Sequence, residues 1–305
     1  MKRFSGITTT QLARICGVSQ GTVDRALHNR PGINEKTREY ILSVAREYDY
    51  LPRVQGSDDG KSMLIGVVLF DLNNEYFSKL TMSLVNEAKR AGYSLIFQFS
   101  EKDLARERKA LDYFNYIGVD GVILFSVGSD DSTYENYLRS LHRPLILIGN
   151  RMFRLPYVGI DDRAAMKELS LRLAEKAPQG DILYYAPILR KPLHALNAQR
   201  LRLQGFTEAM TERRRTFRVI KRKEDVSDFG GIVCATDNYA ASVLKYLNFP
   251  ENVKISGFDN ISLLKMVRVP VLTVEYSTDQ IARECMNYIL GKPYRPDVGF
   301  RIVNS

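Results

Sequence analysis

Residues 17–30, GVSQGTVDRALHNR, place hydroxyl, amide and guanidinium side chains on what their spacing predicts to be one short helix. A helical pattern over residues 10–17 precedes it and stops at Gly17. Helix, glycine-containing turn and helix is a common arrangement for entering the DNA major groove. There, short side chains let the backbone approach phosphate, and Gln or Arg can bond base edges. The alternative is a plain helical hairpin whose charges are solvated.

Motifs for catalysis are missing from the sequence. It contains no G-x-x-x-x-G-K-[ST], no G-x-G-x-x-G and no G-x-S-x-G. Its histidines, His28, His142 and His194, are isolated from one another and lack metal-ligand spacing. We therefore expect a protein that is not an enzyme and that needs neither metal nor cofactor.

Composition is ordinary for a soluble globular protein, with 45% apolar and 26% charged residues in a chain of 305. The net charge of +9 is compatible with nucleic acid, an acidic membrane surface or simple solubility. Three widely spaced cysteines, Cys16, Cys234 and Cys285, favour a reducing compartment without a disulfide framework. No signal peptide or membrane-spanning stretch is evident, so we expect a cytoplasmic protein.

Two styles of pattern divide the chain. Residues 8–50 show three short helical patterns, with Ser19 and Asn34 as N-caps of the second and third. A polar, glycine-rich linker follows at 53–62, and from Met63 short apolar runs alternate with amphipathic helices. Such runs predict parallel strands covered on both faces, hence an α/β fold of two doubly wound lobes with a break near 149–160 and a ligand between them. The predicted strands are 64–70, 94–99, 121–127, 145–149, 182–186, 231–235, 253–258 and 271–275.

The segment 8–52 resembles the headpiece of the LacI family of transcription regulators. The family's hallmark A-G-V-S-x-x-T-V-S-R-V-L-N appears as CGVSQGTVDRALH, followed by INEKTR and by the Tyr50–Leu51–Pro52 ending. Later segments are also similar, so the resemblance covers nearly the whole chain: IGV at 65–67, VDGVIL at 119–124, RLRLQGF at 200–206, ATDNYA at 235–240, ISGFDNI at 255–261 and PVLTV at 270–274.

The resemblance implies a helix-turn-helix headpiece at 1–53, a linker or degenerate hinge at 54–61, and an effector-binding and dimerisation domain at 62–305. That domain is periplasmic-binding-protein-like, with an N-lobe of about 62–150 plus 277–291 and a C-lobe of about 151–276 plus 292–305.

Carried over by position, Gln20, Gly21 and Arg25 fall where the family reads bases. Thr8, Ser19 and Thr22 fall where it touches phosphate, and His28 completes the expected DNA-binding set. Asp24 stands where the family usually has serine, and its carboxylate needs a neutralising neighbour beside phosphate. Gly21 offers no side chain for base contacts.

The hinge departs further from the family pattern. RVQGSDDG replaces the usual N-x-x-A-x-x-L hinge helix, whose leucine wedges into the minor groove. Glycine and two aspartates disfavour both a helix and contact with DNA. We expect leucine intercalation to be absent or altered, and a sharply bent operator in a complex would contradict this.

The resemblance also extends to a pocket. DLNNEYFSKL at 71–80 is similar to the L-N-N-P-F-F segment of ribose-type sugar-binding proteins, in which Asn binds a hydroxyl and two aromatics sandwich the sugar. For Phe77 the alternative to ligand binding is packing in the core. For Asp259 the alternative is capping a helix. Of two arginines that diverge on a helix, Arg200 is favoured over Arg202. The expected effector-binding set is Asn74, Tyr76, Phe77, Asn150, Arg151, Arg200, Arg202, Thr236, Asp259 and Tyr276.

Residues 211–231 are about a dozen residues shorter than the family's usual stretch, and their Arg/Lys run predicts a solvated surface. The sequence as a whole predicts a homodimeric repressor that binds a palindromic operator under control of a sugar or sugar derivative. Thr236 and Tyr276 depart from common family residues, which suggests an effector unlike familiar pentoses and hexoses. A solute-binding sensor module with a weak or vestigial headpiece is the alternative.

Overall fold

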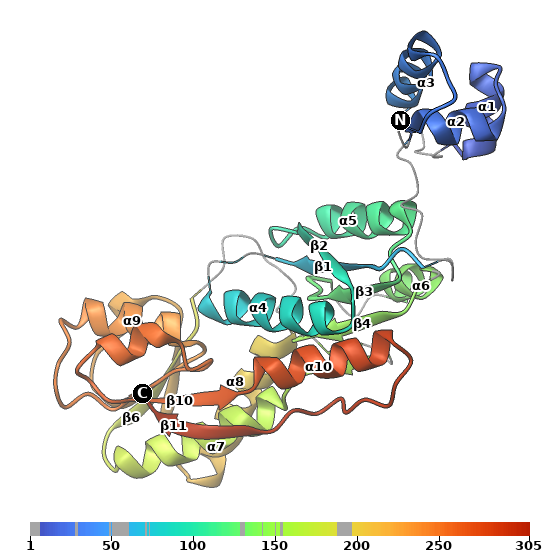
Figure 1. The fold of residues 1–305 in the computed structure, drawn as a ribbon. Helices are drawn as coiled ribbons and strands as arrows, with labels where there is room; N and C mark the ends of the chain where they lie inside the picture. The colour runs from blue at the N-terminus through green and yellow to red at the C-terminus, as the bar shows by residue number, and fades with distance from the viewer. Residues whose placement is uncertain are drawn as a thin grey trace. The chain divides into compact units, whose positions relative to one another are not determined.

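The computed structural model describes residues 7–27, 30–48, 50, 61–70, 72, 74–128, 132–141, 143–149, 151–152, 155–187 and 197–305. The chain divides into two compact units, 1–62 with 112–119 and 63–111 with 120–305. Figure 1 labels most of their helices and several of their strands.

The headpiece holds three helices, α1 (Thr9–Cys16), α2 (Gln20–Leu27) and α3 (Glu35–Glu47). Thr8 and Gln11 form a reciprocal capping box that starts α1. Gly17 ends it at φ 65°, a left-handed conformation that favours glycine. A small buried core joins the three helices: Leu12, Ala13, Cys16, Val23, Ala26, Ile41, Val44, Ala45 and Tyr50.

The first lobe is built on a five-stranded parallel sheet of order β2-β1-β3-β4-β5. Continuous burial of β1, β3 and β4 is expected for strands covered on both faces. The strands are β1 (Leu64–Leu69), β2 (Ser94–Phe99), β3 (Gly121–Leu124), β4 (Leu145–Ile148) and β5 (Tyr157–Val158); the helices between them are α4 (Glu75–Arg90), α5 (Leu104–Ile117) and α6 (Ser132–Ser140).

The second lobe holds a six-stranded sheet of order β11-β10-β9-β8-β6-β7, parallel except for the β10–β11 pair. Its strands are β6 (Asp181–Tyr185), β7 (Phe217–Ile220), β8 (Phe229–Cys234), β9 (Ile255–Ser256), β10 (Val271–Tyr276) and β11 (Phe300–Asn304). The helices α7 (Asp162–Lys176), α8 (Asn197–Glu212), α9 (Asp237–Tyr246) and α10 (Thr278–Ile289) and the 3-10 turns η1 (Lys223–Asp225) and η2 (Ser262–Met266) complete the chain.

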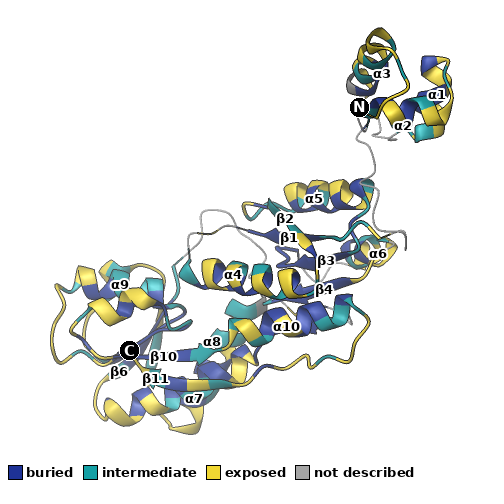
Figure 2. Ribbon diagram, in the orientation of Figure 1, coloured by how far each residue is buried: buried dark blue, intermediate teal, exposed yellow. Residues whose placement is uncertain are grey.

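Alternation along β6 shows how the second sheet is covered. Ile182 and Tyr184 belong to the core cluster with residues of α7 and α8, whereas Leu183 and Tyr185 belong to the cluster with α9. Since successive strand residues point to opposite faces, α7 and α8 cover one face and α9 the other. In the first lobe, α10 packs beside α4 (Figure 1), so the chain returns there after β10. Figure 2 shows the resulting buried interior of both lobes.

The predicted fold class, a helical headpiece followed by a two-lobed α/β domain, is confirmed, and each predicted strand run contains an observed strand. The sequence interpretation missed β5, β7 and β11, which are short or lie at sheet edges. Between β7 and β8 the described chain forms only the turn η1, consistent with the predicted shortening. The basic side chains nearby are paired: Arg213 with Glu175, Arg215 with the Ala177 and Gly180 carbonyls, and Arg218 with Asp181.

Residues 54–60 of the predicted hinge lie outside the described residues, as do His28, His142, His194 and Asn150. No helix among the residues that are described is both long enough and apolar enough to cross a membrane.

Candidate functional site

One face of α2 carries the residues expected to meet DNA. Val23 and Ala26 turn into the headpiece core, and Ser19, Gln20, Gly21 and Arg25 remain exposed. The backbone N–H of Thr22 donates to Ser19 Oγ at 3.1 Å, which caps the helix start. Four of the predicted DNA-binding residues, Ser19, Gln20, Gly21 and Arg25, are therefore exposed on or just before α2, with Thr22 partly buried, and Thr8 is exposed at the start of α1.

Asp24 is paired with a positively charged neighbour, as expected from the sequence for a carboxylate beside phosphate. Arg30 Nη1 donates to Asp24 Oδ2 at 3.0 Å. The Asp24 carboxylate therefore does not present an uncompensated negative charge to a phosphate backbone.

Gln20 donates through its side-chain amide to Thr10 Oγ1, which links the start of α2 to α1.

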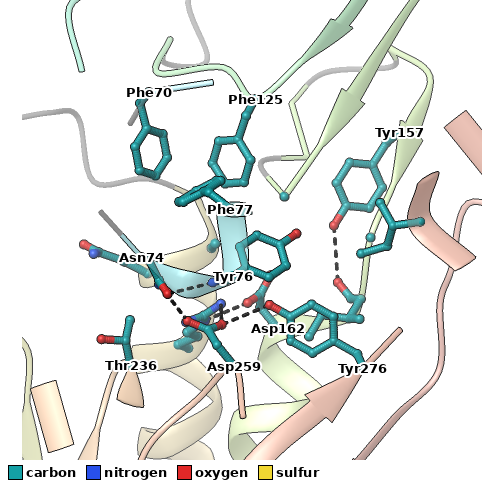
Figure 3. Close-up of a pocket in the computed structure, with 17 residues that line it drawn as sticks. Phe70, Asn74, Tyr76, Phe77, Phe125, Tyr157, Asp162, Thr236, Asp259 and Tyr276 are labelled. Carbon is teal, nitrogen blue, oxygen red and sulfur yellow. Dashed lines mark hydrogen bonds and ion pairs between the residues drawn. The ribbon is translucent and has the colours of Figure 1, made fainter. Parts of the chain in front are cut away.

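A pocket lies where the carboxyl ends of strands from both sheets meet, at the position that open α/β sheets use for ligands. Its volume is about 100 Å³, small beside the roughly 300–1,000 Å³ of pockets for drug-sized ligands. The lining residues, drawn as sticks in Figure 3, are Phe70, Asn74, Tyr76, Phe77, Phe125, Gly149, Tyr157, Gly159, Ile160, Asp162, Ala198, Gln199, Arg202, Thr236, Asp259, Tyr276 and Ile281.

The polar side of this pocket is centred on Asp259. Its carboxylate accepts hydrogen bonds from Asn74 Nδ2 at 3.1 Å and from the Tyr276 hydroxyl at 2.9 Å (Figure 3). Arg202 Nη2 lies 3.8 Å from the same carboxylate. Asn74 belongs to the first lobe and Asp259 follows β9 of the second, so one hydrogen bond joins the lobes across the pocket.

Arg202 lies between two buried carboxylates. Its Nε donates to Asp162 Oδ1 at 2.7 Å, and Nη1 donates to the Ala235 carbonyl at 2.8 Å. Burial would lower the pKa of Arg202, but the charges of Asp162 and Asp259 outweigh it and raise that pKa. Burial raises the pKa of Asp162 to about 6 against the opposing effect of Arg202, and raises that of Asp259 too. The pocket floor is therefore a largely buried charge cluster.

Aromatic rings form the opposite side of the pocket. Phe70, Phe77 and Phe125 contact one another edge to face, with ring centroids 4.6–5.0 Å apart. Tyr76 lies between this group and Tyr276, at 5.1 Å from Phe77 and 5.5 Å from Tyr276. Phe77 thus both packs in the core and lines the pocket, so the two alternatives for it are not exclusive.

Asp259 has an unusual backbone, with φ 108°, in a region that residues other than glycine seldom adopt. Such strain costs about 1–3 kcal/mol and persists where the surroundings fix it, often at binding sites. Asp259 caps no helix; its carboxylate is directed at Asn74 and Tyr276 instead. The capping alternative is therefore excluded.

The preference for Arg200 over Arg202 is wrong. Arg202 lines the pocket, whereas Arg200 is exposed and is not part of the lining. The helical phase explains this, because Arg202, Phe206 and Met210 are four residues apart on the buried stripe of α8. That stripe was visible in the sequence and predicts Arg202 as the inward residue.

Six of the remaining predicted effector residues line the pocket: Asn74, Tyr76, Phe77, Thr236, Asp259 and Tyr276. Arg151 does not, because it is exposed with its guanidinium 5.7 Å from the ring centre of Tyr157. The sequence interpretation missed Phe70, Phe125, Tyr157, Asp162 and Gln199. Phe70 and Phe125 directly follow β1 and β3, and an aromatic residue at a strand's carboxyl end was the signal to use.

A second set of contacts joins the lobes beside the pocket. Glu75, at the start of α4, accepts hydrogen bonds from the Ser262 N–H at 2.8 Å and the Ser262 hydroxyl at 2.7 Å. Lys79 donates to the Asn260 carbonyl at 3.1 Å and pairs with Glu75 at 2.7 Å. We call these contacts of Glu75, Lys79, Asn260 and Ser262 the inter-lobe clamp. It fixes the 260–262 loop to α4 directly after Asp259.

A helix-turn-helix headpiece joined to a two-lobed α/β domain with a pocket between the lobes is the architecture of ligand-responsive DNA-binding regulators. Residues 9–53 match the model of bacterial regulatory proteins of the lacI family. Residues 62–230 match that of periplasmic binding proteins and the sugar-binding domain of the LacI family.

The chain belongs to the LacI family of DNA-binding transcription regulators. It is 26% identical to the ribose operon repressor of Bacillus subtilis (strain 168), over 93% of this chain and 91% of the relative. Among solved structures, a LacI-family regulator from Silicibacter pomeroyi shares the fold with a TM-score of 0.68 and 21% identity, covering 98% of each chain. The structure of the lac repressor dimer bound to operator and the anti-inducer ONPF shares the fold with a TM-score of 0.67 and 16% identity, again covering 98% of each chain.

Proposed function

We propose that this chain is a homodimeric repressor that binds a palindromic operator in the cytoplasm and is controlled by a sugar or sugar derivative. The effector occupies the pocket between the lobes. In the headpiece, Thr8, Ser19 and Thr22 contact phosphate, and Gln20, Gly21 and Arg25 face the base edges. The lobes serve as the dimerisation domain.

The pocket that draws on both lobes is the observation that carries the effector proposal. It combines aromatic faces, on which the C–H face of a sugar stacks, with amide, hydroxyl and carboxylate groups that bond hydroxyls. The matched sugar-binding domain and the ribose operon repressor among the relatives support a sugar-type ligand.

The exposed face of α2 supports operator binding. One helix-turn-helix contacts too little DNA for operator-level selectivity, so we expect two headpieces on a two-fold symmetric site. The lac repressor, which shares this fold, was solved as a dimer on its operator. That comparison supports the same arrangement for this chain.

Ligand and DNA are coupled through lobe closure. The Asn74–Asp259 hydrogen bond and the adjoining inter-lobe clamp hold the start of α4 in the first lobe against the 259–262 segment of the second. An effector that favours the closed state shifts the closed–open equilibrium by no more than its differential affinity for the two states. The shift changes the spacing of the two headpieces and hence operator affinity.

A footprint of the full chain on DNA that flanks its own gene tests the proposal. We expect protection of two half-sites related by two-fold symmetry, with centres about 34–36 Å or a multiple apart. Sequence-independent binding alone, or no binding, would instead support a solute-binding sensor with a vestigial headpiece.

The clamp yields a prediction about Glu75. Burial would raise its pKa, but hydrogen bonds from Lys79 and Ser262 lower it to about 2. Because the folded pKa lies below the unfolded value, the stabilisation is complete above about pH 4.5 and is lost as the pH falls towards 2. Glu75→Gln should lower the stability by about 1.5–3 kcal/mol at pH 7. The deficit should shrink as the pH falls.

Thermal unfolding at pH 7 and pH 3 measures this effect. Glu135→Gln is the matched control, because Glu135 forms a similar i,i+4 pair with Arg139 and its side chain is 24% exposed against 26% for Glu75. Equal losses in the two variants would mean that the clamp contributes no more than a local helix pair.

A further inference from the structure

The pocket floor contains more negative than positive charge. Among the described residues that line the pocket, Asp162 and Asp259 are acidic and Arg202 is the single basic one. Their side chains are 6%, 4% and 11% exposed, so water does little to compensate the difference. One guanidinium thus faces two buried carboxylates.

The guanidinium of Arg202 is already committed to the protein. Its Nε and Nη1 donate to Asp162 and to the Ala235 carbonyl, and its Cζ atom lies 3.5 Å from the ring centre of Phe258. Its Nη2 makes no hydrogen bond within the described structure and lies 3.8 Å from Asp259. Arg151, the other predicted pocket arginine, lies exposed over Tyr157. The guanidinium that lines the pocket therefore already faces two carboxylates, which disfavours an anionic ligand beside it.

Beside its amide and hydroxyl groups, the lining offers a ligand carboxylate acceptors and aromatic ring faces. Asp162 uses one carboxylate oxygen for Arg202, and Asp259 accepts from two neutral donors, Asn74 and Tyr276. The rings of Tyr76 and Tyr276 stand 5.5 Å apart beside these carboxylates (Figure 3). Carboxylates flanked by aromatic rings are the surroundings that bind ammonium groups, through charge and through cation–π attraction.

The neighbouring titratable groups do not remove the charge difference. Burial raises the pKa values of Tyr76 and Tyr276, so both stay neutral near pH 7. Asp237 lies behind the floor, where it accepts from Thr273 Oγ1 and the Ile261 N–H. Burial raises the pKa of Asp162 to about 6, and Asp259 adds to this rise against Arg202. That direction is expected for a carboxylate with an incomplete counter-charge.

We propose that the effector carries a protonated amine, as an aminated sugar does, and that Asp162 and Asp259 hold the ammonium group at the pocket floor. This inference rests on the proposed function, since it assigns a chemical class to the sugar-type effector. The sugar ring lies against Tyr76 and Phe77, and the ammonium supplies the positive charge that the floor lacks.

Matched sugars test the proposal on the full chain. Each set holds an aminated sugar, its hydroxyl parent and its N-acetyl derivative, which keeps the nitrogen but loses the charge: the glucosamine, galactosamine and mannosamine sets. Thermal shift finds binders, and calorimetry gives their affinities. We expect at least one amine to bind about tenfold or more tighter than its parent and its N-acetyl form.

Two variants locate the effect. Asp162→Asn should reduce the preference for the amine about tenfold. Asp161→Asn is the control, because the exposed neighbour Asp161 caps α7 and asparagine caps equally well. A preference that Asp161→Asn reduces equally, or that Asp162→Asn leaves unchanged, would overturn the assignment to Asp162.

Operator binding, followed by anisotropy with each sugar, separates failure of this inference from failure of the proposed function. A neutral sugar that binds at least as tightly as its amine and alters operator affinity contradicts the ammonium proposal. The proposed function as a sugar-controlled regulator would then still hold. If no aminated sugar binds, the ammonium proposal is also wrong. If no sugar of either kind binds or alters operator affinity, both the ammonium proposal and the proposed control by a sugar are contradicted.

Discussion

Replacing Arg202 with methionine should destabilise the two-lobed domain more than any other single change proposed for it. The substitution leaves Asp162 and Asp259 buried without their cation, and removing one partner of a buried ion pair costs about 3–5 kcal/mol. For a domain of this size that corresponds to a fall of roughly 6–20 °C in Tm. Differential scanning calorimetry measures it.

The pH dependence of the Arg202→Met loss has a definite sign. Without the guanidinium, the folded-state pKa values of both carboxyls rise further above the unfolded values. Stability in the variant is then greatest at low pH and falls as the pH rises through those raised values. The deficit against the unmodified protein should be larger at pH 8 than at pH 5.

Arg200→Met is the matched control on the same helix. Arg200 is exposed, and a surface substitution of this kind changes stability by about 0.5 kcal/mol or less. A larger loss from Arg200→Met than from Arg202→Met would contradict the placement of Arg202 at the pocket floor.

Arg25→Ala should remove most specific operator binding. A bidentate contact to a guanine is worth about 1–3 kcal/mol, and a symmetric operator contains the contact twice. The expected total of about 2–6 kcal/mol weakens binding roughly 30-fold or more. Fluorescence anisotropy on operator and scrambled duplexes at one salt concentration measures the loss of specificity.

Arg14→Ala removes the same charge from α1, where Arg14 is exposed at the last turn. It should weaken operator and scrambled DNA alike and leave their affinity ratio unchanged. Effector binding should persist in both variants. If Arg25→Ala keeps its preference for the operator, α2 is not the helix that reads bases.

Most of the fold was predictable because its central strands are buried on both faces. Continuous apolar runs mark β1, β3, β4 and β8, and no solvent-facing residues interrupt them. The three missed strands lack that signal, since β5 has two residues and β7 and β11 lie at edges of the second sheet. An edge strand pairs on one side only, so its residues need not be apolar.

The pocket was predictable in part. Asp259 follows β9 and Asn74 caps the start of α4 after β1, and polar residues in such strand-to-helix segments indicate a ligand site. Asp162 was missed because it begins a helix, where an acidic residue is ordinary and its contact with Arg202 spans 40 positions of sequence. No local pattern reveals a charge cluster whose members come from separate elements.

Reciprocal coupling between effector and operator is the measurement that tests the central claim most directly. Operator affinity is measured with and without a saturating sugar from the matched sets, and sugar affinity with and without operator. Linkage requires that both affinities change by the same factor, and we expect a change of about 5–150-fold. A sugar that binds tightly but leaves operator affinity unchanged would contradict the account.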